Sequence, residues 1–96
     1  MEDKNKKTGV ELIVEERRRQ IEEEGWTPEH DKWWRGGELC RAAVCYIKRP
    51  DWLDPVLWQE WPFELSWWKP TPQDRIRELQ KAGALIAAEI DRLLNS

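Results

Sequence analysis

The amino-acid sequence predicts an all-α fold: a small helical bundle of three main helices plus short helices, with a Trp/Pro-rich ordered loop packed over it. Apolar residues recur at helical spacing in three stretches, and threonine start signals precede three of the predicted helices. No stretch alternates apolar and polar residues as a strand does. The 96 residues have the length of one domain, 1–96, of which residues 1–8 are expected to be flexible.

The first helix is predicted from Val10 to Glu24. Thr8 and Glu11 have the spacing of a capping box, and Gly25 stands where a left-handed residue commonly ends a helix. Its apolar stripe is narrow and consists of Val10, Ile13, Val14 and Ile21. Its outer face holds opposite charges four residues apart, Glu15 with Arg19, Arg18 with Glu22 and Arg19 with Glu23, and each such pair contributes ~0.2 to 0.5 kcal/mol. We interpret these charged residues as a solvated face.

Thr27 and Pro28 predict the start of a second, short helix that runs to about Trp34, since proline suits the first helical position after a threonine cap. Gly36-Gly37 then interrupts the chain. A third helix is predicted to end before Pro50, and its apolar stripe consists of Leu39, Ala42, Ala43, Tyr46 and Ile47. Small residues in the middle of this helix allow a neighbouring helix to approach closely.

The helical spacing is lost between Pro50 and Pro72, where five of the eight tryptophans and five of the six prolines lie. We predict an ordered Trp/Pro-rich loop over residues 50–71, because long loops in compact domains commonly pack by their own side chains or carry function. Asp54-Pro55 is able to cap one or two helical turns within it, ending before Pro62.

Thr71-Pro72 predicts the start of the last helix, which runs from Pro72 to about Leu94. Its apolar residues alternate by three and four positions, as in a heptad seam, and are Ile76, Leu79, Gly83, Ile86, Ile90 and Leu93. At ~1.5 Å per residue the helix spans ~34 Å, so that it is long enough to brace the other helices.

The composition excludes several classes of protein. The chain carries 16 basic and 19 acidic residues, a net charge of −3, whereas a nucleic-acid clamp normally has a basic excess. Cys40 and Cys45 have neither redox-motif nor zinc-site spacing and are predicted to be reduced. No apolar run approaches the ~20 residues of a membrane span, and the charged first residues lack a secretory signal. A reducing cytosol is the predicted location.

Tryptophan is the most unusual feature of the composition. Each of the eight can bury ~150 to 250 Å², and most are predicted in the core because the aliphatic stripes are narrow. The adjacent pairs Trp33-Trp34 and Trp67-Trp68 cannot bury both members equally, since neighbouring side chains point in different directions. One indole of each pair is a predicted surface contact, able to stack on a nucleobase, a cation or an apolar partner.

His30 is the single histidine, and with Asp31 and Glu38 it allows a proton-transfer or metal pocket to be drawn. A histidine in the first turn of a helix is more commonly a cap or a surface residue. Lys69 lies near the amino end of the last helix, where a small anion can bind locally.

The acid pattern of the all-α nucleotide pyrophosphohydrolases, Glu-x-x-Glu followed by Glu-x-x-Asp, is not present. The chain has Glu11 and Glu15 four residues apart, and Glu89 and Asp91 two apart, so this spacing does not assemble paired magnesium ligands. No Gly-rich phosphate loop or nucleophile elbow occurs. We therefore predict no catalytic residues, no metal site and no cofactor.

Several sequence blocks contain uncommon residues in a fixed order: Glu24-Gly25-Trp26-Thr27-Pro28-Glu29-His30-Asp31, Gly37-Glu38-Leu39, Trp61-Pro62-Phe63, Trp67-Trp68-Lys69-Pro70 and Lys81-Ala82-Gly83-Ala84-Leu85-Ile86. Through these blocks the chain resembles a set of small phage and prophage proteins of no assigned activity. The resemblance covers about residues 17–93. It implies a viral protein made in the host bacterial cytoplasm, and proteins of this kind commonly act by binding.

The predicted function is that of a non-catalytic counter-defence inhibitor, which binds a host defence protein or sequesters its nucleotide signal. A homo-oligomer is expected, because the third helix and the heptad of the last helix offer a seam. The predicted ligand- or partner-binding residues are His30, Asp31, Trp33, Trp34, Glu38, Trp67, Trp68 and Lys69. Two alternatives remain: a small metal-dependent nucleotide hydrolase whose acids converge in three dimensions, and a structural subunit of a phage assembly.

Overall fold

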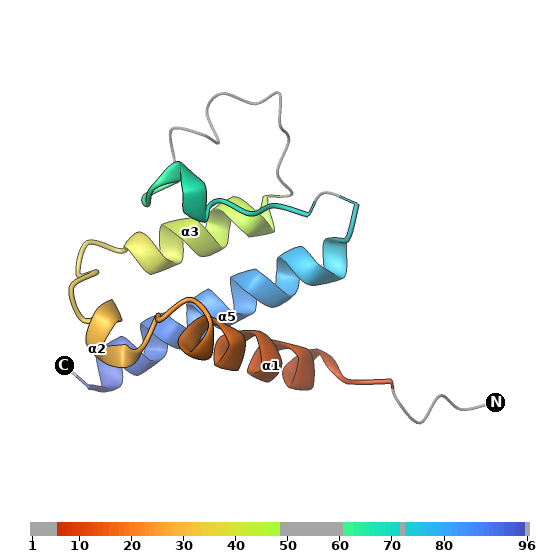
Figure 1. Cartoon of the computed structure of the whole chain (residues 1–96), viewed down its shortest axis with the longest axis horizontal. Coiled ribbons are helices and arrows are strands. Elements are labelled where there is room, and N and C mark those ends of the chain that lie inside the picture. Colours follow the sequence, from red (N-terminus) through yellow and green to blue (C-terminus); the bar gives the residue numbers. More distant parts are fainter. Residues whose placement is uncertain (1–5, 49–60, 72, 96) are drawn as a thin grey trace.

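A computed structural model describes residues 6–48, 61–71 and 73–95 of the chain. Within them the protein is all-α, as predicted, and contains no strand. Its elements are α1 (Gly9–Glu22), α2 (Pro28–Asp31), α3 (Glu38–Ile47), the 3-10 turn η1 (Leu65–Trp67) and α5 (Arg75–Leu94). Helix α5 lies in the middle of Figure 1, with α3 on one side and α1 on the other, and it packs against α1, α2 and α3. The expectations for residues 1–5 and 49–60, including the turn predicted after Asp54, lie outside the described residues.

The predicted capping box starts α1. The Thr8 hydroxyl accepts a hydrogen bond from the Glu11 backbone N–H, and the Glu11 carboxylate accepts one from the Thr8 backbone N–H. The helix ends at Glu22, two residues before the predicted end, and Gly25 adopts a left-handed φ of 76° in the turn that follows. A residue with a Cβ rarely adopts this conformation, which explains the glycine.

Helices α2 and α3 also begin at predicted signals. The Thr27 hydroxyl accepts a hydrogen bond from the backbone N–H of His30, but α2 ends at Asp31, three residues before Trp34, and is a single turn. Gly37 precedes α3 with a left-handed φ of 82°, as expected for a glycine break.

Helix α5 begins later than the Thr71-Pro72 signal predicts. Its N-cap is Asp74, whose side chain accepts a hydrogen bond from the Arg77 backbone N–H, and the first helical residue is Arg75. The Asp74 N–H donates to the Thr71 carbonyl in a preceding turn. An aspartate satisfies the first free N–H groups of a helix as well as a threonine does, so the later cap prevails.

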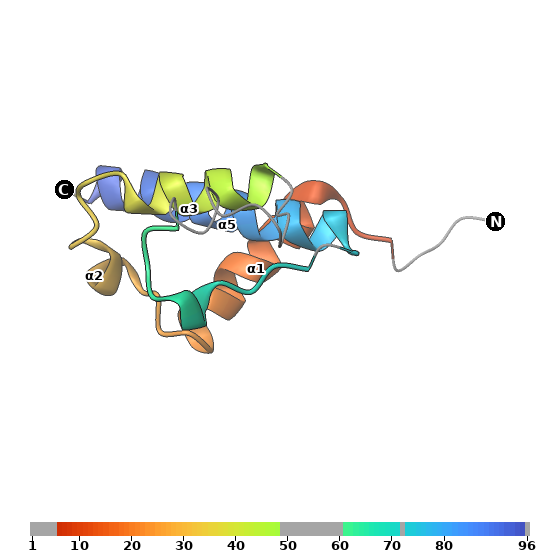
Figure 2. The same cartoon turned by 90° about the horizontal axis from the view of Figure 1, so that it is seen from above.

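The core lies between α3 and α5 and is built of small and aromatic residues. Its buried members are Leu39, Ala42, Ala43, Cys45, Tyr46, Trp61, Ala82, Leu85 and Ala88. The alanines on both helices allow the close approach predicted for α3, and residues 61–71 cover the pair from one side (Figure 2). Trp26, Trp34, Phe63, Trp67 and Trp68 pack around this core. Most of the described tryptophans therefore serve the core, as predicted.

Two predicted helix faces are wrong. The heptad seam of the last helix is largely exposed: Ile76, Leu79, Ile86, Ile90 and Leu93 are each 43% to 66% accessible, whereas Ala82, Ala84, Leu85 and Ala88 are buried. On α1, Val10 and Val14 are exposed, while Glu16, Arg17 and Gln20 are buried. The charged residues of the predicted solvated face, Glu15, Arg18, Arg19, Glu22 and Glu23, are exposed or half-buried. Polar side chains fill the space that its narrow apolar stripe leaves.

Helices α1 and α5 approach closely at Gly83. A Cβ atom at this position would lie 2.5 Å from Cδ1 of Ile13, which is too close for van der Waals contact. Glycine at the middle of α5 is therefore explained by the helix crossing. Among the described residues, no helix has the length and apolar content that a membrane span requires. Cys40 is exposed and Cys45 is buried, and neither forms a disulfide.

Candidate functional site

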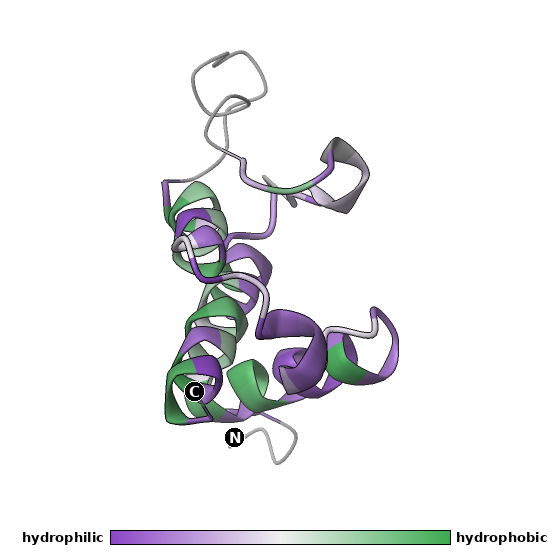
Figure 3. Ribbon diagram, turned by 90° about the vertical axis from the view of Figure 1, so that its left-hand side faces the viewer, coloured by the Kyte–Doolittle hydropathy of each residue, from purple (hydrophilic) through white to green (hydrophobic). Residues whose placement is uncertain are grey.

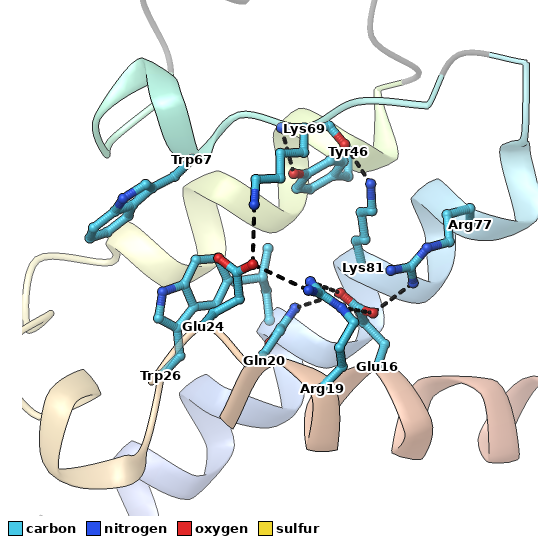
Figure 4. A pocket seen from close by; sticks show the side chains of 11 residues that line it. Glu16, Arg19, Gln20, Glu24, Trp26, Tyr46, Trp67, Lys69, Arg77 and Lys81 are labelled. Carbon is cyan, nitrogen blue, oxygen red and sulfur yellow. Dashed lines mark hydrogen bonds and ion pairs between the residues drawn. The ribbon is translucent and has the colours of Figure 1, made fainter. Parts of the chain in front are cut away.

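A charged pocket lies where α1, α3, α5 and the 61–71 segment meet (Figure 4). It is an open cavity of about 110 Å³. Four cations line it, Arg19, Lys69, Arg77 and Lys81, together with the two carboxylates Glu16 and Glu24. The remaining walls are Gln20, Leu85 and the aromatic rings of Trp26, Tyr46 and Trp67. We call this cavity the cationic pocket.

Helix α1 supplies the floor of the cationic pocket, since residues 16, 19 and 20 lie on one helical face. Glu16 is 2% exposed. The Arg19 guanidinium donates two hydrogen bonds to its carboxylate, each at 2.9 Å, and from α5 the Arg77 Nη1 lies 2.6 Å from Glu16 Oε1. One buried carboxylate therefore holds two arginines from different helices in place.

The protonation of this cluster is set by its ion pairs. Burial acts to raise the pKa of the Glu16 carboxyl, but the hydrogen bonds and charges of Arg19 and Arg77 outweigh burial and hold that pKa below its ordinary value. The bond to Glu16 raises the pKa of Arg19. The cluster thus consists of a carboxylate and two guanidinium ions at neutral pH, and Glu16 is not available as a general base.

Gln20 is buried beside Glu16 at the cationic pocket. Its side chain is 1% exposed, and its Nε2 donates to Glu16 Oε2 at 3.4 Å. This bond fixes the orientation of the amide, because the reverse orientation would place two oxygens against each other. The Oε1 atom is buried and accepts no hydrogen bond among the described residues.

Lys69 and Lys81 form the opposite wall. The Lys69 Nζ lies 3.1 Å from Glu24 Oε1, and Lys81 Nζ donates to the Lys69 carbonyl beside the ring of Tyr46. Burial lowers the pKa of Lys81 and raises the pKa of Tyr46 to about 12. Burial alone would raise the pKa of Glu24, but the neighbouring Lys69 and Arg19 hold it below its ordinary value.

Aromatic rings extend from the mouth of the cationic pocket. Trp26 and Trp67 lie with ring centroids 5.9 Å apart at 47°, and both line the cavity. The rings continue through Phe63 to Trp34, whose centroids are 5.0 Å apart. An indole at the edge of a positively charged cavity offers a stacking surface to a planar ligand.

The structure brings several of the predicted site residues together. His30 Nδ1 lies 3.1 Å from Asp31 Oδ1, and the His30 ring contacts the rings of Trp34 and Trp67 at centroid distances of 5.8 and 6.3 Å. Trp67 and Lys69 line the cationic pocket itself. These residues form a continuous series of contacts that runs from α2 to the 61–71 segment.

The burial and the contacts of Asp31 indicate a structural role. It is 1% exposed, and Arg17 Nη2 lies 3.5 Å from its Oδ2. Burial raises the pKa of its carboxyl, against the opposing influence of His30 and Arg17. Arg17 also donates to the Trp26 carbonyl at 3.0 Å, so that this cluster fastens α2 and the turn before it to α1.

The other predicted residues lie apart. Trp33 is 69% exposed, and Lys32 lies over its ring at 5.2 Å. Trp68 packs against Tyr46 and Trp61 in the core, each at a centroid distance of 4.8 Å. Glu38 accepts a hydrogen bond from the Gly36 N–H at 2.7 Å, which stabilises the turn before α3. Of the two adjacent pairs, Trp33-Trp34 has one clearly exposed member, whereas Trp67 and Trp68 are both half-buried.

Sequence reasoning missed most of the cationic pocket. Glu16, Arg19 and Gln20 share one face of α1, and Arg77 and Lys81 share one face of α5 at the same spacing. The available signal was the apolar stripe of α1, which is too narrow to fill the contact that this helix makes with α5. Among the described residues, no three His, Cys, Asp or Glu side chains cluster in a way that could hold a metal ion.

Comparisons of the chain with protein-family profiles, with curated proteins and with solved structures found no match.

Proposed function

We propose that the protein binds a nucleotide, or a small organic phosphate of similar build, in the cationic pocket without transforming it. Its cellular role would be the sequestration of a nucleotide signal of host defence, the setting that the likeness to phage proteins implies. The observation that carries the proposal is the convergence of four cations on one cavity that holds two carboxylates.

The charges of the cationic pocket fit a phosphate group. Four cations against two carboxylates leave two positive charges in excess, which matches the charge of a phosphate monoester at neutral pH. Guanidinium and ammonium groups are the usual protein donors to phosphate oxygens. Hydrogen bonds in which the donor or the acceptor is charged are stronger than those between neutral groups. Because Glu16 already holds Arg19 and Arg77, two donors are preorganised before a ligand arrives.

The dimensions of the site favour a ligand whose phosphate lies inside the cavity and whose base lies outside it. A volume of about 110 Å³ accommodates a phosphate group, whereas pockets that enclose a whole drug-sized ligand measure ~300 to 1,000 Å³. The base would then lie at the mouth of the cavity, against Trp26 or Trp67.

Titration of tryptophan fluorescence tests this proposal, because two of the indoles line the cavity. We expect saturable binding of AMP or ATP and weaker binding of inorganic phosphate. Arg77→Gln and Lys69→Gln should each weaken binding about 10- to 100-fold, since a hydrogen bond to a charged group contributes ~1.5 to 3 kcal/mol. Arg18→Gln is the matched control, because it removes the same charge from an exposed position of α1. Equal losses in all three variants would contradict a specific site.

The recovered ligand separates binding from hydrolysis. Nucleotide incubated with the protein and Mg²⁺ should be recovered unchanged by chromatography. Magnesium-dependent conversion of the nucleotide would instead establish the hydrolase alternative. Native mass spectrometry of protein purified from cells with an active nucleotide-signalling defence should show a bound nucleotide. Retention of a host protein, with no small molecule, would assign the inhibitor role to direct protein binding.

A further inference from the structure

The carboxylate of Glu24 lies between two cations of the cationic pocket (Figure 4). Its Oε1 is 3.1 Å from Lys69 Nζ and 3.2 Å from Arg19 Nη1. Figures 2 and 3 show the carboxyl end of α1 and the 61–71 segment on the same side of the α3–α5 pair, and the Glu24–Lys69 ion pair joins these two parts of the chain. The Glu24 side chain is 18% exposed, whereas that of Glu16 is 1% exposed. Of the two carboxylates, Glu24 is therefore the one that solvent reaches.

We propose that the Glu24 carboxylate occupies the place of the ligand's phosphate, and that a bound phosphate displaces it from Lys69 and Arg19. This inference rests on the proposed function, because it describes how an anion enters the cationic pocket. Glu24 then acts as an internal competitor that sets the affinity of the site and the charge of the ligand that can enter.

A carboxylate and a phosphate group compete for the same donors, since both accept hydrogen bonds from guanidinium and ammonium ions. Glu24 Oε1 accepts from Arg19 and from Lys69. Burial alone would raise the pKa of Glu24, but the hydrogen bonds and charges of these two cations outweigh burial and hold that pKa below its ordinary value. The competitor is thus negatively charged at neutral pH.

The position of Glu24 in the chain allows its side chain to leave. Helix α1 ends at Glu22, so that Glu24 lies in the turn that follows. The backbone of this turn is held independently, because the Trp26 N–H donates to the Gln20 carbonyl at 2.9 Å. Rotation of the Glu24 side chain into solvent therefore leaves the turn in place, and partly exposed ion pairs contribute little to stability. Glu16, which is buried, has no such route.

The competition favours a ligand with a terminal phosphate. A phosphodiester carries one negative charge, as Glu24 does, so that its exchange for the carboxylate replaces like with like. A phosphate monoester carries ~1.5 to 2 negative charges at neutral pH and interacts more strongly with Arg19 and Lys69. The site should therefore select a nucleoside monophosphate over a cyclic nucleotide that contains the same base and sugar.

Titration of tryptophan fluorescence with AMP and with cyclic AMP tests the inference. We expect the wild type to bind AMP at least about 10-fold more tightly than cyclic AMP. Glu24→Gln should tighten the binding of both ligands by the same factor, about 10-fold, because the same competitor is removed in each case.

Glu23→Gln is the matched control for the lost charge. Glu23 Oε2 also lies near Arg19 Nη1, at 3.5 Å, but this side chain is exposed and does not line the cationic pocket. Its replacement should leave both affinities within about twofold of the wild type. Because the expected effect of Glu24→Gln is a gain of binding, a loss of folded protein cannot imitate it.

The outcomes separate this inference from the proposed function. Unchanged affinities in Glu24→Gln, beside the loss in Arg77→Gln, would overturn the inference alone. A larger gain for AMP than for cyclic AMP would also overturn it, because Glu24 would then repel ligands in proportion to their charge without sharing their place. Equal binding of the two nucleotides by the wild type would contradict the selection by charge. Failure of both the wild type and Glu24→Gln to bind AMP would overturn the proposed function as well.

Discussion

Glu16 is the residue on which the geometry of the cationic pocket depends. It is buried, and its carboxylate joins Arg19 of its own helix to Arg77 of α5. Without this carboxylate, the two guanidinium groups would repel each other. Removal of one partner from a buried ion pair commonly costs ~3 to 5 kcal/mol, because an uncompensated charge remains.

The lowered pKa of Glu16 predicts a particular acid sensitivity. A carboxyl whose pKa is lower in the folded than in the unfolded state stabilises the fold above its ordinary value of 4.5, and this contribution is lost as the pH falls through the folded-state pKa. In urea unfolding, the wild-type free energy of unfolding should therefore fall as the pH is lowered below about 4.5. Glu16→Gln should be less stable at pH 7 and should lose less of its stability on acidification.

Glu22→Gln provides the control for this experiment, because Glu22 is exposed on the same helix. It should keep the acid dependence of the wild type. Parallel pH profiles for the wild type and Glu16→Gln would show that the two arginines do not act through this carboxylate.

At the residue scale, the sequence allowed part of the candidate site to be predicted. Trp67 and Lys69 were identified, and they line the cationic pocket. Arg19 was assigned to a solvated face, since charges four residues apart are mostly exposed in helices, and Glu16 was not singled out. Glu16 is buried because Arg19 of its own helix and Arg77 of α5 close over its carboxylate, a long-range arrangement that helical periodicity does not encode.

At the scale of single elements, the crossing of α1 and α5 sets a steric requirement at Gly83. Replacement of a helix-interior glycine by alanine normally stabilises a helix by ~0.8 to 1.0 kcal/mol. Here the new methyl group would meet Ile13, and overpacking of this kind costs ~1 to 3 kcal/mol. Gly83→Ala should therefore lower the free energy of unfolding in the wild-type background.

A double-mutant cycle separates the two effects. In an Ile13→Ala background the space above position 83 is open, so that Gly83→Ala should raise the free energy of unfolding by about 1 kcal/mol. A change of the same sign in both backgrounds would exclude the steric explanation. Chemical denaturation followed by circular dichroism measures all four proteins.

The ends of the helices were predicted more accurately than the sides that the helices bury. The capping box of α1, the Thr27 cap of α2 and the left-handed Gly25 and Gly37 all depend on local backbone hydrogen bonding, which neighbouring residues determine. The exposed face of α5 could not be identified in this way. A heptad stripe predicts that another helix packs against it, but it does not tell whether that helix belongs to the same chain or to another.

At the scale of the whole molecule, the binding proposal predicts a linkage between ligand and stability. A ligand that binds the folded state alone adds about 2.7 kcal/mol at a concentration of 100 times its dissociation constant. AMP at that excess should raise the melting temperature of the wild type, and the increase should be smaller at high salt because the pocket charges are screened. Differential scanning fluorimetry measures both effects.

The attachment of the 61–71 segment has a consequence for how the protein can diversify. Its residue 69 is held through main-chain atoms: the N–H donates to the Tyr46 hydroxyl at 3.3 Å, and the carbonyl accepts from Lys81. The side chain of Lys69, by contrast, reaches out to Glu24. A substitution at position 69 can thus alter the charge offered to an anion while the segment stays anchored.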